Sequence, residues 1–152
     1  MYIISIITVI IVSVLMMMLT DWGIGSVIWF IDPVSLLLIL LITIPIMLSA
    51  GLLKDLNNAF RIATKKNIEL TYRELKRGIE AVCLLRRTLI AAGAFTALFS
   101  LVMVLMGCEE QVLLAPNCAV AIMGFVYAMG FVIILLPLES RLKIKLQDMM
   151  HE

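Results

Sequence analysis

Four long apolar segments without a single charge constrain this chain more than any other feature. They comprise residues 2–19, 34–53, 88–107 and 118–138. A helix needs about 20 apolar residues to cross the hydrocarbon core of a bilayer. Backbone N–H and C=O groups find no water in lipid, so each segment must be helical. We therefore predict an all-α integral membrane protein with four transmembrane helices, forming one membrane domain over residues 1–152.

The basic residues predict how these helices are oriented. All 12 Lys and Arg residues lie within residues 54–87 or after residue 139, whereas the other connections carry only acids: Asp21, Asp32, Glu109 and Glu110. Basic loops stay on the cytoplasmic side of a membrane. We expect both termini in the cytoplasm, together with the 54–87 connection and a tail at 139–152.

Composition agrees with this class. Hydrophobic residues make up 63% of the chain, which is more apolar surface than a soluble domain of this size can bury. A basic cytoplasmic face is the ordinary membrane pattern, so we do not expect a nucleic-acid partner. The first segment has no basic residue before it and no cleavage site of small residues after it. We expect it to be retained as a transmembrane helix rather than removed as a signal peptide.

The connection at 54–87 is predicted to be a short cytoplasmic helical hairpin. Asn67 is expected to cap its second helix, after a turn at Lys65 and Lys66. An apolar stripe follows at spacings of four and three: Ile68, Tyr72, Leu75, Ile79 and Val82. The stripe either packs against its own neighbour or offers a contact surface to another protein.

Cysteine and histidine placement gives no indication of enzyme chemistry. Cys83 is interpreted as an apolar filler, while Cys108 and Cys118 bracket the second outer connection and would bridge only in an oxidising compartment. His151 is isolated, and no nucleophile lies beside a base. We predict no catalytic residue, no metal site and no cofactor.

Small and polar residues recur at helical spacing on one face of each of the last two predicted spans. Small residues allow membrane helices to approach closely. A tight helix pair is one interpretation of this pattern, and a lining for an ion path or for another helix is the other. The faces consist of Gly93, Thr96, Ala97 and Ser100, and of Ala121, Gly124 and Ala128.

Several motifs lie between about residues 28 and 143. The second predicted span begins Asp32-Pro33-Val34-Ser35-Leu36 and is followed by Gly51-Leu52-Leu53-Lys54-Asp55-Leu56-Asn57-Asn58-Ala59-Phe60. The third has Gly93, Thr96 and Ser100, and the fourth has Ala115-Pro116 and later Tyr127-Ala128, followed by Pro137-Leu138-Glu139-Ser140-Arg141-Leu142. Together these motifs resemble the MotA/TolQ/ExbB proton channel family, whose third span reads Pro-x-x-Gly-x-x-Gly-Thr-x-x-Gly, and most closely the flagellar stator A subunits.

This resemblance implies a rotary motor without catalytic residues of its own. Family members form a ring of five A subunits around two single-span MotB- or ExbD-like subunits, whose membrane aspartates carry the ion. The corresponding ion-path or partner-facing positions here are Gly93, Thr96, Ala97, Ser100, Ala121, Gly124, Tyr127 and Ala128. Tyr127 is expected either to anchor a neighbouring subunit or to border the ion path. This chain has no acid within its predicted spans, as expected if the partner supplies it.

Departures from the family pattern shape the remaining expectations. Sodium-coupled members place threonine hydroxyls where this chain has Ala97, Gly124 and Phe125, so H⁺ is expected rather than Na⁺. The family proline of the third span is Ile90, whereas the proline ending the fourth is kept as Pro137. Pro137 is a predicted hinge, and Pro45 is predicted to be a hinge or a packing kink.

The cytoplasmic part is far shorter than in flagellar stators, so the load is not predicted. Exposed candidates for contact with a load are Arg73, Glu74, Lys76, Arg77 and Glu80. Alternatives to a stator are an ExbB/TolQ-like energiser that passes force across the envelope and a membrane scaffold without ion flux. A small four-span carboxylate transporter fits less well, because such proteins carry their own membrane glutamate.

Overall fold

The structure is a computed structural model that describes residues 2–19, 32–64, 71–107 and 111–151. Side-chain surroundings are described within residues 6–15, 32–62, 71–107 and 114–150. The elements within these ranges are all helices: α1 (Tyr2–Leu19), α3 (Pro33–Ser49), α4 (Leu53–Thr64), α5 (Tyr72–Gly107) and α6 (Gln111–His151). The predicted all-helical class is confirmed for this part of the chain.

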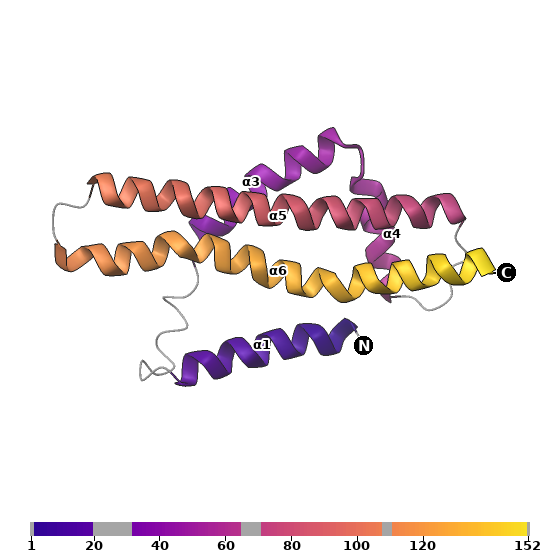
Figure 1. Ribbon diagram of the computed structural model, residues 1–152, viewed down its shortest axis with the longest axis horizontal. Coiled ribbons are helices and arrows are strands. Elements are labelled where there is room, and N and C mark those ends of the chain that lie inside the picture. Colours follow the sequence, from indigo (N-terminus) through magenta and orange to yellow (C-terminus); the bar gives the residue numbers. More distant parts are fainter. Residues whose placement is uncertain (1, 20–31, 65–70, 108–110, 152) are drawn as a thin grey trace.

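Helices α5 and α6 form an antiparallel pair that runs the length of the molecule (Figure 1). Both are long and apolar enough to cross a membrane, and α3 with α4 would count as a third span if the bent pair is taken together. In α1 the apolar stretch with described side chains, Ile6–Leu15, is shorter. The length and apolar composition of these helices are those of a helical membrane protein. That the chain has four spans remains a prediction.

The other helices pack around this pair. Helix α3 crosses α5, α4 lies across both α5 and α6, and α1 lies against α6 (Figure 1). The N-terminal end of α1 and the C-terminal end of α6 point in the same direction, and α4 lies in that half of the molecule (Figure 1). Along the chain, helices α1, α3, α5 and α6 alternate in direction.

The third predicted span and the second arm of the predicted hairpin form one continuous helix, α5, of 36 residues. At 1.5 Å per residue its length is about 54 Å, well beyond the hydrocarbon thickness. The helix begins after Thr71, whose N–H donates to Glu74 Oε2 at 3.1 Å. This contact is half of a capping box, so the cap predicted at Asn67 is wrong for the start of this helix. Asn67, Lys65 and Lys66 themselves lie outside the described residues.

The second predicted span ends earlier than expected. Helix α3 stops at Ser49, and α4 leaves it at an angle of 103°. Gly51 makes the turn possible, since its φ of +66° lies in the left-handed region that side chains disfavour. The predicted span at 34–53 is therefore corrected to a helix at Pro33–Ser49. The break lies after Pro45, which α3 accommodates without interruption.

A compact apolar core joins α4 to the charged half of α5 and the end of α6. Leu75 and Val82 of the predicted stripe are fully buried there, together with Ala59, Leu138 and Leu142. Ile79 is partly buried against the same cluster. The stripe thus packs against its own neighbours, except that Tyr72 is 45% exposed because it lies in the first turn, beyond this core. Ile68 lies outside the described residues.

The need for glycine in the turn at position 51 can be tested by substitution with alanine, which adds a single methyl group. A Cβ at this position meets no atom within 4 Å, so Gly51→Ala changes only the backbone energy. We expect it to lower the free energy of unfolding by about 1–2 kcal/mol, the cost of a left-handed residue with a side chain. Thermal unfolding in detergent micelles is the measurement. Gly130→Ala is the control: it also meets open space but lies within α6, and it should be neutral or stabilising.

Candidate functional site

The small-residue faces of α5 and α6 meet each other inside the chain. A Cβ added to Gly93 would overlap the Cβ of Ala128 and would lie 3.4 Å from the carbonyl oxygen of Gly124. Only a glycine at position 93 allows the two backbones to approach so closely. The tight helix pair, one of the two interpretations of this pattern, is therefore observed.

Thr96 and Gly124 continue this contact towards α3. A Cβ at Gly124 would lie 3.0 Å from Thr96 Oγ1 and 3.7 Å from the Cβ of Ser35. The buried Thr96 hydroxyl donates to the backbone oxygen of Ala92 at 2.9 Å and lies 3.1 Å from that of Gly93. Its proton is therefore bonded within α5, and the oxygen faces the gap that Gly124 leaves open.

The remaining small residues predicted for the ion path differ in their exposure. Ala97 and Ala121 are buried and Ser100 is half-buried. The residues of this set that meet between α5 and α6 are Gly93, Thr96, Gly124 and Ala128. The partner-facing role of the whole set stays a prediction.

Tyr127 is held at the start of α3. The Asp32 N–H donates to the Tyr127 hydroxyl oxygen at 2.8 Å, across 95 residues of sequence. The Asp32 carboxylate accepts from the Val34 N–H at 3.1 Å and from the Ser35 hydroxyl at 2.5 Å, which caps α3. The two roles predicted for Tyr127, anchoring a neighbouring subunit and bordering the ion path, stay predictions. Within the chain, Tyr127 has a further role, because its hydroxyl group fixes the beginning of α3 against α6.

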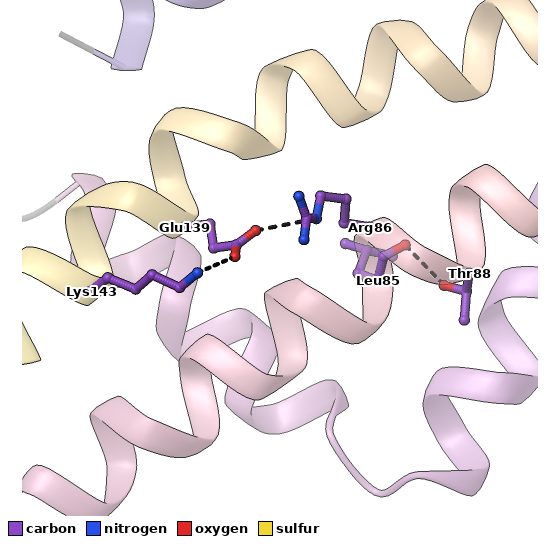
Figure 2. Close-up of polar contacts among 5 residues, drawn as sticks. All are labelled: Leu85, Arg86, Thr88, Glu139 and Lys143. Atoms are coloured by element: carbon purple, nitrogen blue, oxygen red, sulfur yellow. Dashed lines mark hydrogen bonds and ion pairs between the residues drawn. The ribbon is translucent and has the colours of Figure 1, made fainter.

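Sequence reasoning missed an ion cluster around Glu139. This carboxylate is only 5% exposed, and its Oε1 accepts from Lys143 Nζ at 2.7 Å. Its Oε2 lies 3.3 Å from Arg86 Nε, an ion pair between α6 and α5 (Figure 2). The signal was present in the sequence, since Glu139 directly follows a predicted span, has a lysine four residues later, and is expected at the same membrane boundary as Arg86.

The predicted load-contact residues divide into two groups. Arg73, Glu74, Lys76, Arg77 and Glu80 are all exposed, as expected. However, Glu74 caps α5, and Arg77 Nε lies 3.5 Å from Asp55 Oδ2 of α4. Two of the five side chains therefore support the fold of this chain, and Arg73, Lys76 and Glu80 are the better candidates for an external contact.

Both predicted hinge residues lie inside helices. Pro45 falls within α3 and Pro137 within α6, which runs without interruption from Gln111 to His151. The tail at 139–152 is thus largely a continuation of α6. Cys83 and Cys118 are free thiols, while Cys108 lies outside the described residues. Among the described residues, no group of His, Cys, Asp and Glu is arranged to hold a metal ion.

Comparison of the chain with protein-family models, with curated proteins and with solved structures finds no match. The function of the chain is therefore inferred from its own residues and their geometry.

Gly93→Ala tests the closest contact in the molecule. The added methyl group overlaps Ala128, so we expect a loss of about 1–3 kcal/mol in the free energy of unfolding, as for other overpacked cores. Ala128→Gly removes the opposing methyl group. The double variant Gly93→Ala, Ala128→Gly should recover much of the loss, and strictly additive effects in a double-mutant cycle would contradict the contact.

Glu139→Gln tests the buried ion cluster. The change keeps the side-chain volume but leaves Arg86 without its anionic partner, and we expect a cost of about 1–3 kcal/mol in detergent unfolding. Lys143→Gln is the matched variant on the exposed side of the same carboxylate and should cost less than about 1 kcal/mol. A larger loss for Lys143→Gln than for Glu139→Gln would show that the Arg86 pair is unimportant.

Proposed function

We propose that this chain is the A subunit of an ion-driven rotary motor, five copies of which surround two single-span partner subunits. In this proposal it spans a bacterial inner membrane four times, with both termini in the cytoplasm. The alternating directions of α1, α3, α5 and α6 support the four spans (Figure 1). The start of α1, the end of α6 and α4 all lie in one half of the molecule, which supports a common cytoplasmic side.

One observation carries the proposal: a close-packed helix pair of apolar and small residues with no ionisable group at membrane depth. Within residues 88–107 of α5 and 114–138 of α6 there is no Asp, Glu, Lys, Arg or His. An ion carrier in a membrane needs a titratable group. Placing such a group inside the bilayer costs free energy, so its presence there marks a functional site. If this chain takes part in ion transfer, the group must come from another subunit.

The exposed surface of the pair supports assembly with other helices. Phe95, Leu98 and Phe99 on α5 and Ile122 and Val126 on α6 are all exposed large apolar side chains. Lipid or neighbouring helices must cover them in the membrane. A ring places part of this surface against partner helices and leaves the rest to lipid.

The proposed mechanism uses the charge of the partner's aspartate. An ionised carboxylate cannot move across apolar ring surface without a large desolvation cost, so it is held near polar groups. Protonation removes that cost and allows the ring to step. In this chain the oxygen of Thr96, beside Gly124, is a polar atom buried at the contact between α5 and α6.

Protons are the coupling ion that these residues favour. A desolvated sodium ion needs several oxygen ligands. Ala97 and Gly124 carry none, and the Thr96 hydroxyl already donates to its own helix backbone. A single hydroxyl oxygen can accept a hydrogen bond from a protonated acid but does not form a sodium site.

An ExbB/TolQ-like energiser is the second candidate, and the use of Glu74 and Arg77 within the fold favours it. These two residues cap α5 and tie it to α4, which leaves a small charged surface for a flagellar rotor. The same membrane machinery would then act on another load. A scaffold without ion flux is the remaining alternative.

The mass of the purified complex tests the assembly. The chain is co-expressed with the products of its neighbouring open reading frames, and the detergent-solubilised complex is weighed by native mass spectrometry. Five copies of this chain with two of the partner are expected. A particle that contains this chain alone would exclude the motor.

Substitutions at the polar centre test the ion-dependent step. Thr96→Val keeps the side-chain shape but removes the oxygen, and we expect ion-dependent output to fall about fivefold, as for the loss of a neutral hydrogen bond of about 1 kcal/mol. Gly124→Leu should also abolish output, because its side chain would meet Thr96 and Ser35. Thr96→Ser retains the hydroxyl and Cys83→Ala lies outside the interface, so both should be close to normal. Equal losses in all four variants would indicate general destabilisation.

A further inference from the structure

A cavity of about 390 Å³ lies between α3 and α5, outside the α5–α6 interface. Ile42 and Ile46 of α3 form one wall, and Ala91, Ala92 and Phe95 of α5 form the other. It opens to the surface, since Ala91 and Ile46 are exposed and Phe95 is 61% exposed. A surface groove with apolar walls at this depth must be filled by an apolar group in a membrane.

Among the described residues that line the cavity, Arg87 alone is charged, and it lies at the predicted membrane boundary of α5. The 20 residues that follow it, 88–107, carry no charge. From Arg87 to Phe95 the groove follows α5 for about 12 Å into the apolar part of the helix. The cation and the apolar walls are thus arranged along the membrane normal.

Two adjacent arginines have different surroundings here. Arg86 turns towards α6 and pairs with Glu139, whereas Arg87 is exposed and makes no ion pair with any described residue. Successive residues on a helix point about 100° apart, which explains why only one of them reaches α6. Thr88 beside Arg87 donates its hydroxyl to the Leu85 backbone oxygen at 2.9 Å (Figure 2). Of the side chains that the structure describes around this groove, the guanidinium of Arg87 is therefore the charged group available to a ligand.

We propose that this groove binds an anionic phospholipid of the adjacent leaflet, with the phosphate at Arg87 and an acyl chain between α3 and α5. Arginine forms strong bidentate bonds to phosphate oxygens. Basic pockets between membrane helices on the cytoplasmic side are suited to anionic headgroups. The site depends on the membrane location of the chain and is independent of the motor.

A second copy of this chain is unsuited to fill the groove, because none of its described acidic side chains is available to pair with Arg87 at this depth. A protein partner at this depth would have to neutralise Arg87 with an acid at the membrane boundary. The described acid of this chain at that boundary is Glu139, which is buried and engaged by Arg86 and Lys143. A lipid supplies a negative headgroup at the membrane boundary, where Arg87 lies, and an apolar chain deeper in the bilayer, where the apolar walls of the groove lie.

Native mass spectrometry of the purified full chain tests this site by titration with phosphatidylglycerol and with phosphatidylcholine of the same acyl chains. The wild type should retain phosphatidylglycerol preferentially. Arg87→Gln should lower that preference about fivefold, equivalent to about 1 kcal/mol, and Arg87→Lys should lower it less. Arg141→Gln removes the same charge from an exposed position on α6 and should leave the preference unchanged.

A second variant tests the apolar part of the groove. Ala91→Leu fills the cavity from its exposed side and should weaken retention of both lipids, while Ala119→Leu, at an exposed position of α6, should not. If Arg87→Gln and Arg141→Gln lower the preference for phosphatidylglycerol equally, that preference arises from the overall positive charge of the protein surface, and the proposal is overturned. Unchanged retention in Ala91→Leu, or a change in oligomeric state instead, would assign the groove to another occupant.

Discussion

The close approach of α5 and α6 at Gly93 and Ala128 is the contact on which the rest of the structure depends. Lipid tails are as apolar as leucine side chains, so no hydrophobic driving force joins two helices in a bilayer. Association relies on close van der Waals packing, and a missing Cβ at position 93 makes it possible. Thr96 and Gly124 extend the same contact to Ser35 of α3, and Tyr127 holds the start of that helix.

Charge divides the α5–α6 pair into an apolar part and a charged part. In the charged part, Glu139 pairs with Arg86 and Lys143, and Asp55 of α4 pairs with Arg77. Buried Leu75, Val82 and Leu142 join α4 to this part of α5 and to α6. Residues 88–107 of α5 and 114–138 of α6 carry no charged side chain. In the proposed motor, the ion-carrying group would therefore belong to a partner, and the charged part would contact the load.

Much of this arrangement follows from the sequence. Uncharged apolar runs predict α5 and α6 because lipid leaves the backbone no alternative, and the small residues at Gly93, Gly124 and Ala128 predict the face on which they meet. The helix break after Ser49 is less predictable, since Pro45 draws attention while Gly51 makes the turn. The Asp32–Tyr127 bond joins residues 95 positions apart, so no local pattern indicates it. The cavity at Arg87 depends on the angle between α3 and α5, which only the fold determines.

The central claim is that an acid from another subunit lies against the small-residue pair of this chain. Electron cryo-microscopy of the complex purified with its single-span partner tests this most directly. The account predicts copies of α5 and α6 around a foreign helix, with a carboxylate of that helix at the depth of Thr96. A complex without a helix at its centre, or a central helix without a titratable group at membrane depth, would contradict it.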